Sequence, residues 1–151
     1  MINYRAFIVG VKTTKLTNKE KKFLKKYKPW GVILFTRNIK NIKQTRELTS
    51  SIRKIFGNNK YPILIDQEGG RVSRLKNLIS FDNLTSEFFG KKFINNPKEF
   101  SSFYKLFIDK TSELLKLIGV NINTSPVLDL RVKGSSNIIG DRSFSNNPKI
   151  V

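Results

Sequence analysis

Short, wholly apolar runs alternate with helix-like segments along this chain, and this alternation limits the possible folds more than any other feature. Three of these runs are expected to be strands, at residues 6–11, 32–35 and 61–66, and a shorter, more polar segment at residues 120–123 is expected to be a fourth strand. Strands that are apolar throughout are typical of parallel sheets that are covered on both faces. A repeated strand–helix–strand order then predicts parallel strands joined by right-handed crossovers.

The first helix is expected to start near Thr17 or Asn18, since either side chain is suited to an N-cap. The proline and glycine of residues 29–31 are expected to break it before the second strand begins. Its apolar side chains recur at intervals of three and four, as an amphipathic helix requires. These side chains are Phe23, Leu24 and Tyr27.

Two further helices are expected, each with a recognisable boundary. Asn41 is suited to cap the second helix, and Gly57 follows its last apolar position. The third helix is expected over residues 97–119, with Gly119 at its C-terminal end. Residues 67–97 are rich in Gly, Asn and Ser and are expected to form a long irregular loop, which is usually functional.

Two α/β architectures fit this order of elements. Four strand–helix units would make the N-terminal half of a (β/α)8 TIM-type barrel, a fold of about 250 residues. A doubly wound open sheet has the same alternation, and periodicity does not separate the two. We expect the half barrel, in which the first and last strands would each have an unpaired edge.

The composition removes several classes of chemistry. The chain contains no cysteine and no histidine, so it has no disulfide, no thiolate nucleophile and no imidazole base. No cluster of metal-ligand residues is visible, and neither a metal nor a cofactor is expected.

The net charge of +18 has two interpretations. It could indicate a nucleic-acid or anionic membrane partner. However, 21 of the 29 basic residues are Lys, whereas base and phosphate recognition favours the Arg fork. We therefore attribute the net charge to a Lys-biased composition, and we expect neither a nucleic acid nor a membrane as partner. The apolar run at residues 7–11 is too short for a signal peptide or a membrane span, and a cytoplasmic location is expected.

The most informative segment is DQEGGRV at residues 66–72, which follows the third strand. Functional residues of α/β folds gather at the carboxyl ends of strands. Asp66 and Glu68 would share one face if the strand continued, about 6.8 Å apart, and could form an acid/base pair. The alternative is favoured: Asp66 accepts ligand hydroxyls or backbone N–H groups, while Glu68 pairs with Arg71 or Arg74.

This segment resembles the signature of family 3 glycoside hydrolases, specifically the bacterial β-N-acetylglucosaminidases of cell-wall recycling. Further segments resemble the same family in the same order. They are residues 31–38, 44–53, 119–123, 125–130 and 139–144. The resemblance implies that the whole of residues 1–151 is a partial N-terminal barrel domain of this family, truncated at its C-terminus.

The resemblance also implies a carbohydrate site at the mouth of the barrel. Asp66 would accept hydrogen bonds from hydroxyls of N-acetylglucosamine, and Arg74 and Arg142 would donate to sugar oxygens. The alternatives are that Arg74 is a surface charge paired with Glu68 and that Arg142 clamps the loop of Asp129. Asp129 and Asp141 are expected to be loop or cap residues. Supporting donors are expected at Asn38, Gln67 and Ser143.

Members of this family cleave with retention, through a covalent glycosyl–aspartate, and a histidine on a mobile loop delivers the proton. Both groups follow the Arg-Ser-Phe motif that is found here at residues 142–144, so no catalytic residue is expected in this chain and both are expected beyond Val151. The implied substrate is an N-acetylglucosamine-containing muropeptide, and no turnover is expected from this chain alone. Two alternatives stand: a non-catalytic or vestigial sugar-binding half barrel, and, less favoured, a basic nucleic-acid-binding domain.

Overall fold

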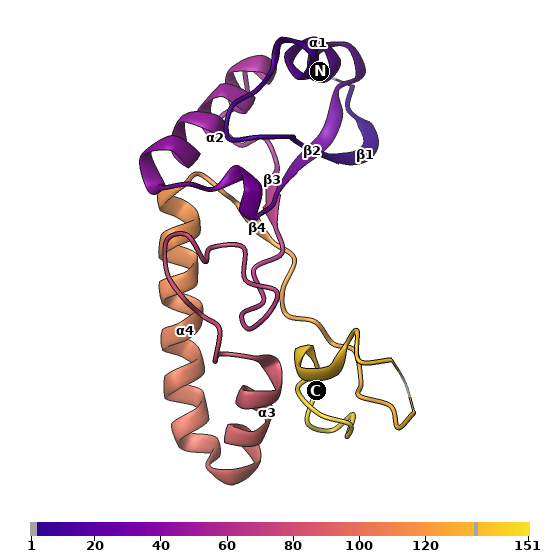
Figure 1. Cartoon of the computed structure of the whole chain (residues 1–151), viewed down its shortest axis with the longest axis vertical. Helices are drawn as coiled ribbons and strands as arrows, with labels where there is room; N and C mark the ends of the chain where they lie inside the picture. Colours follow the sequence, from indigo (N-terminus) through magenta and orange to yellow (C-terminus); the bar gives the residue numbers. More distant parts are fainter. Residues whose placement is uncertain (1–2, 135) are drawn as a thin grey trace.

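The computed structural model describes residues 3–134 and 136–151 (Figure 1). Strands alternate with one or two helices as far as Asn123, and an irregular segment follows the last strand. Along the chain the elements are β1 (Arg5–Gly10), α1 (Asn18–Tyr27), β2 (Pro29–Leu34), η1 (Thr36–Asn38), α2 (Ile42–Phe56), β3 (Ile63–Ile65), α3 (Ser86–Asn95), α4 (Pro97–Leu117), β4 (Ile122–Asn123) and η2 (Gly140–Arg142).

The strands form one parallel sheet in the order β1-β2-β3-β4, so each strand pairs with its neighbours in sequence. Val32 aligns with Ile63, and Leu64 aligns with Ile122. A doubly wound sheet reverses its strand order at a switch point, and this sheet does not. The expectation of an α/β chain that forms the N-terminal half of a (β/α)8 barrel is confirmed.

Helix α1 begins at a capping box, in which the Thr17 hydroxyl accepts from the Glu20 N–H and the Glu20 carboxylate accepts from the Thr17 N–H. The N-cap is therefore Thr17, not Asn18. The helix ends at Lys28, which has a left-handed backbone with φ of 49°. This turn lets β2 start at once, so the expectation that residues 29–31 lie outside the strand is wrong.

Helix α3 lies inside the segment that we expected to be irregular, and that expectation is wrong for residues 86–95. The Thr85 hydroxyl caps it by accepting from the Phe88 N–H at 3.0 Å. Asn96 then ends α3 and caps α4, where its side chain accepts from the Glu99 N–H. The helix is short and contains Gly90, so its sequence has no long apolar periodicity.

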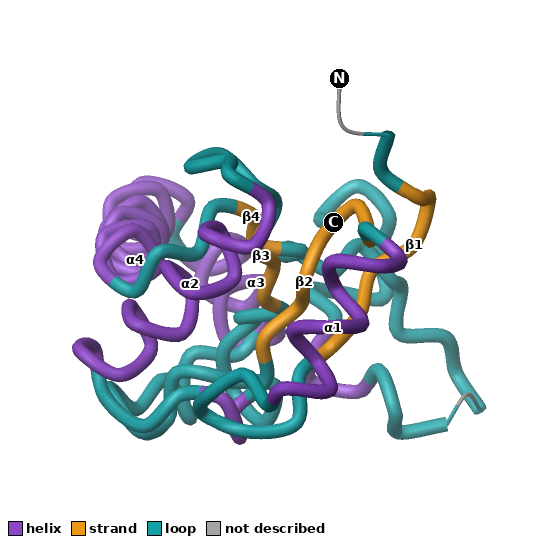
Figure 2. The backbone as a smooth tube through the Cα atoms, turned by 90° about the horizontal axis from the view of Figure 1, so that it is seen from above, coloured by secondary structure: helices purple, strands orange, loops and turns teal. Residues whose placement is uncertain are grey.

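Helices α1, α2 and α4 pack on one face of the sheet, around strands β2 to β4 (Figure 2). Leu24 of α1, Ile52 of α2 and Leu115 of α4 are all buried in that core with Val32 and Ile65. Leu64 points to the other face, because side chains alternate along a strand. That face is not covered by a helix of the described residues, and in a complete barrel it would line the interior.

The segment after β4 turns back to α3, where it places η2 (Figure 1). The contact is close at Gly90, since a Cβ built on this residue would lie 1.9 Å from the carbonyl oxygen of Phe144. None of the helices within residues 3–134 and 136–151 has both the length and the hydropathy to cross a membrane.

Candidate functional site

Asp66 follows the last residue of β3 and forms a fork with Arg74. Arg74 Nε donates to Oδ1 at 2.8 Å, and Nη2 donates to Oδ2 at 2.6 Å. The hydrogen bonds to Asp66 raise the pKa of Arg74 above its ordinary value. About a quarter of each side chain is exposed, 24% for Asp66 and 25% for Arg74, so the pair is fixed and still accessible.

The side chain of Gln67 fixes the backbone at Arg74, and so supports this ion pair. Its side chain is 1% exposed, and Oε1 accepts from the backbone N–H groups of Arg74 at 2.8 Å and Leu75 at 3.0 Å. The backbone of Gln67 is bound in turn by Asn123, whose amide accepts from its N–H and donates to its carbonyl. The ends of β3 and β4 therefore position Arg74 together.

A second fork joins Glu68 to Arg142, which are far apart in the sequence. Arg142 Nε and Nη2 each donate to a carboxylate oxygen of Glu68 at 2.8 Å, and this contact raises the pKa of Arg142. The expected pairing of Glu68 with Arg71 or Arg74 is wrong. Arg71 pairs instead with Asp141, at 2.9 Å. Asp66 and Glu68 thus lie in separate ion pairs.

The two glycines after Glu68 serve the chain's own packing. Gly69 and Gly70 both have positive φ, 98° and 53°. A Cβ on Gly69 would lie 2.1 Å from the carbonyl oxygen of Leu84, and one on Gly70 would lie 2.6 Å from Cγ2 of Thr85. The two glycines therefore let the backbone at residues 69–70 pack closely against Leu84 and Thr85, which lead into α3.

Asn38 and Ser143, expected as supporting donors, both fix loops. The buried Asn38 amide accepts from the Phe35 N–H and donates to the carbonyls of Val11 and Thr13. The Ser143 hydroxyl lies 2.6 Å from the carbonyl oxygen of Asp129. The loop of Asp129 is thus held by Ser143, while the neighbouring Arg142 binds Glu68.

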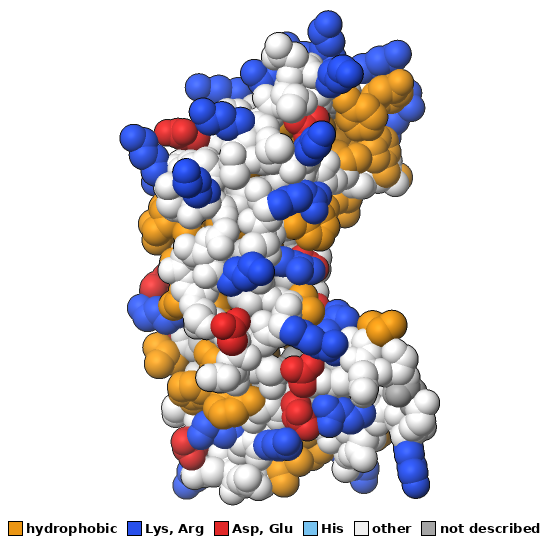
Figure 3. Space-filling view, viewed as in Figure 1, with side chains coloured by type: hydrophobic (Ala, Val, Ile, Leu, Met, Phe, Trp, Pro, Cys, Tyr) orange, Lys and Arg blue, Asp and Glu red, His pale blue; other side chains and the backbone are white. Residues whose placement is uncertain are grey.

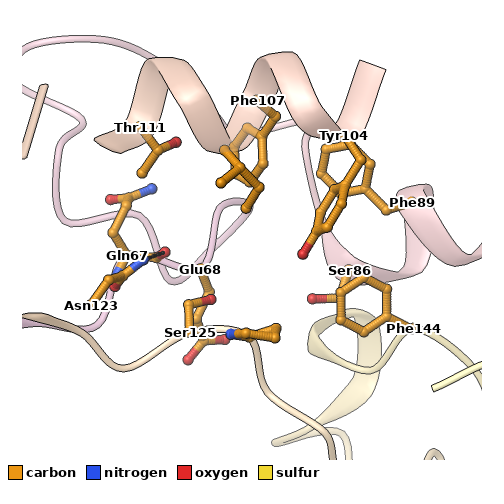
Figure 4. Close-up of a pocket in the computed structure, with 12 residues that line it drawn as sticks. Gln67, Glu68, Ser86, Phe89, Tyr104, Phe107, Thr111, Asn123, Ser125 and Phe144 are labelled. Carbon is orange, nitrogen blue, oxygen red and sulfur yellow. Dashed lines mark hydrogen bonds between the residues drawn. The ribbon is translucent and has the colours of Figure 1, made fainter. Parts of the chain in front are cut away.

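A small, partly open cavity of about 40 Å³ lies on the helix side of the sheet, between the ends of β3 and β4 and helices α3 and α4 (Figure 4). Gln67 and Glu68 line one wall, and Thr111 and Tyr104 of α4 lie across from them. Asp66 does not line this cavity. It lies at the carboxyl end of β3, and the carbohydrate site that we expected there stays a prediction.

Within the described residues, no group of three or more His, Cys, Asp or Glu side chains is arranged to hold a metal ion. The polar groups at the open edge are paired carboxylates, guanidinium groups and amides. Such groups accept and donate hydrogen bonds at fixed positions, which suits a ligand with several hydroxyls.

Consecutive parallel strand–helix units, with charged side chains at the carboxyl ends of the strands, define this chain as part of a (β/α)8 barrel of the enzyme type. The sequence matches the description "Glycosyl hydrolase family 3 N terminal domain" over residues 4–151. The chain belongs to glycoside hydrolase family 3, as its motifs indicated.

Curated relatives are named beta-hexosaminidase. That of Hydrogenovibrio crunogenus is 36% identical over 144 residues, which cover 95% of this chain and 40% of the relative. That of Thioalkalivibrio sulfidiphilus is 32% identical over 145 residues, 95% of this chain and 41% of the relative. The chain therefore spans less than half the length of these relatives.

The fold is similar to solved structures of NagZ from Neisseria gonorrhoeae. The structure in complex with N-trifluoroacetyl-D-glucosamine is 28% identical and has a TM-score of 0.79. The similarity covers 99% of this chain and 44% of that one. The architecture of this chain is thus similar to that of less than half of the NagZ chain.

Proposed function

We propose that this chain forms the sugar-binding part of a retaining β-N-acetylhexosaminidase that releases terminal N-acetylglucosamine from peptidoglycan fragments. Asp66 accepts hydrogen bonds from sugar hydroxyls, and Arg74 and Arg142 donate to sugar oxygens. The substrate is an N-acetylglucosamine-containing muropeptide. A cytoplasmic location stays a prediction from the sequence.

The observation that supports this proposal is the Asp66–Arg74 fork at the carboxyl end of β3. Each carboxylate oxygen has two lone pairs, so Asp66 can bind Arg74 and still accept a hydroxyl on each oxygen. Arg74 uses Nε and Nη2 for this contact, and Nη1, which donates to no acceptor in the described part of the chain, is left for a ligand. The relative in complex with N-trifluoroacetyl-D-glucosamine supports a sugar of the N-acylglucosamine type.

The test is binding of N-acetylglucosamine to the wild-type protein and to Asp66→Asn. The amide has the shape of the carboxylate but lacks its charge, so we expect about tenfold weaker binding, as for the loss of one charge-assisted hydrogen bond. The matched control is Asp82→Asn, since Asp82 is exposed and its carboxylate accepts only from Ser80 among the hydrogen bonds of the described residues. Equal affinities of wild type and Asp66→Asn would remove Asp66 from the site.

A further inference from the structure

Arg37 is a second guanidinium at the same edge of the sheet, in the turn after β2. Its guanidinium carbon lies 4.6 Å from the centre of the Phe35 ring, and its Nε donates to the carbonyl of Val11 at 3.1 Å. Stacking on an aromatic face and one backbone hydrogen bond fix the plane of the group. Arg37 is therefore held in one orientation although it is exposed.

Because Gly10 has no side chain, Arg37 and Phe35 can pack against its backbone. A Cβ on Gly10 would lie 3.2 Å from Nη2 of Arg37 and 3.3 Å from Cε2 of Phe35. Both distances are shorter than ordinary carbon contacts, so a larger residue would push the stack aside. The ends of β1 and β2 together thus position Arg37.

Arg37 is a neighbour of the Asp66–Arg74 fork. The guanidinium carbon of Arg74 lies 5.6 Å from the centre of the same Phe35 ring. The two guanidinium groups are therefore no more than about 10 Å apart, a separation that one small ligand can span. Both guanidinium groups thus contact the same aromatic ring, that of Phe35.

The two groups differ in their charge balance. Arg74 is neutralised by Asp66, whereas no carboxylate of the described residues lies within 4.0 Å of Arg37. Among the described residues, Arg37 donates one side-chain hydrogen bond, through Nε, and its terminal nitrogens have no protein acceptor. A fixed guanidinium with free terminal nitrogens is suited to bind a carboxylate through two hydrogen bonds.

The surrounding charge strengthens this preference. Residues 1–60 contain 16 basic residues (Lys and Arg) but only 2 acidic residues (Asp and Glu). Residues 61–151 contain 13 basic and 9 acidic residues. Each ion pair of the described residues joins partners between positions 66 and 142. Figure 3 shows basic side chains dominating the end of the molecule that holds α1 and β1. A chain-wide lysine bias does not explain this separation of acidic from basic residues, and the resulting potential attracts anions.

We propose that Arg37 determines specificity by binding a carboxylate of the substrate next to the N-acetylglucosamine that Asp66 holds. This inference rests on the proposed function, because Asp66 and Arg74 define where the sugar lies. The carboxylate belongs either to the group attached through the glycosidic oxygen or to a substituent on the sugar itself. In both cases Arg37 donates two hydrogen bonds to it.

The experiment compares three probes: the methyl β-glycoside of N-acetylglucosamine, its carboxymethyl β-glycoside, and the methyl β-glycoside with a 3-O-carboxymethyl group. We expect one of the two carboxylated probes to bind the wild-type protein about tenfold more tightly than the neutral probe. The probe that shows this advantage identifies the position of the carboxylate. The advantage should shrink as the salt concentration is raised.

Arg37→Gln should abolish the advantage of the carboxylated probe and leave the affinity for the neutral probe unchanged. The matched control is Arg46→Gln, an equal loss of charge on the exposed surface of α2, which should keep the advantage. An advantage that survives in Arg37→Gln, or equal binding of all three probes to the wild type, would overturn the inference while the sugar site stands. Equal weakening of all probes by Arg37→Gln would show that Arg37 only holds the loop of Val11. A neutral probe that fails to bind the wild type would overturn the proposed function and this inference with it.

Discussion

Arg74 binds Asp66 through two parallel hydrogen bonds, of 2.8 Å and 2.6 Å, across a loop of seven residues. The loop can bring Arg74 back to Asp66 because the Gln67 side chain accepts hydrogen bonds from the N–H groups of Arg74 and Leu75, and because Gly69 adopts a positive φ. The carboxylate oxygens of Asp66 are thereby held in a fixed orientation. Such preorganisation reduces the ordering cost of binding.

The Glu68–Arg142 fork should be the more important pair for stability. Only 6% of the Glu68 side chain is exposed, so removal of Arg142 would leave a carboxylate with little access to water. We expect Arg142→Ala to lower the free energy of unfolding by about 2 kcal/mol, less than for a fully buried pair because Arg142 is 23% exposed. Urea denaturation measures this change.

The double variant Glu68→Gln with Arg142→Gln provides the control for that prediction. Replacing both charges removes the unpaired carboxylate, so part of the lost stability should return. If the double variant loses as much unfolding free energy as the single variants Glu68→Gln and Arg142→Gln lose together, the two side chains do not act as a pair in solution.

Gly90→Ala should displace the segment after β4. The added methyl group would lie 1.9 Å from the carbonyl oxygen of Phe144. Because Gly90 is held in helix α3, the backbone of Phe144 would have to move away. We expect faster amide hydrogen exchange over residues 140–145 and weaker N-acetylglucosamine binding, because Arg142 lies in that segment. Gly57→Ala is the comparison, since Gly57 has a φ of 58° but no atom of the residues that the structure describes lies within 4 Å of the new methyl group. It should cost about 1 kcal/mol of stability and leave sugar affinity unchanged. Protection of residues 140–145 that is the same in Gly90→Ala and wild type would contradict the packing described here.

The capping box of α1 predicts a pH dependence. Burial alone would raise the pKa of Glu20, but hydrogen bonds from the Thr17 hydroxyl and from the N–H groups of Lys12 and Thr17 lower it below the ordinary value of 4.5. A carboxyl with a lowered folded-state pKa stabilises the fold fully above its ordinary pKa, and this contribution is lost as the pH falls through the lowered value.

Glu20→Gln should therefore destabilise the protein at neutral pH and approach wild-type stability in acid. The loss at neutral pH should be about 1 kcal/mol, similar to that of Thr17→Ala. Unfolding free energies of both variants at neutral and acidic pH provide the measurement. A difference between Glu20→Gln and wild type that stays constant with pH would show that the carboxylate charge is not involved.

Hydrolysis by this chain alone should be undetectable. Retaining cleavage needs two groups that flank the glycosidic bond, and the carboxylates of Asp66 and Glu68 are each held in an ion pair. A chromogenic aryl N-acetyl-β-glucosaminide reports turnover directly, and we expect the rate of buffer alone. Turnover that Asp66→Asn abolishes would restore the interpretation of Asp66 and Glu68 as an acid/base pair.

Local sequence signals predicted most of the barrel elements. Three apolar runs and one more polar segment identified the four strands, and the caps at Thr17, Asn41 and Gly57 gave the start of α1 and both ends of α2. These signals depend on neighbours within a few residues, which is why they can be read from the chain. Helix α3 was missed because its stability comes from packing, above all from Phe89, which is 1% exposed.

The choice of site residues stays a prediction, and the pairing of these residues was not predicted. Asp66, Arg74 and Arg142 were chosen from the motifs, and the structure brings all three to residues 66–68 at the end of β3. The partner of Glu68 could not be predicted, because Arg142 lies 74 positions away and reaches it through the turn of the last segment onto α3. The contribution of Arg37 was equally hidden, since its stack depends on Gly10 in another strand.

The most direct test of the sugar site is a titration of the ¹⁵N-labelled protein with N-acetylglucosamine, followed through the arginine side-chain Nε–H signals. We predict saturable shifts of the Arg74 and Arg142 signals with one common dissociation constant, while the Arg46 signal stays unchanged. Signals of Arg74 and Arg142 that do not move, with perturbations elsewhere or none at all, would contradict a carbohydrate site at Asp66.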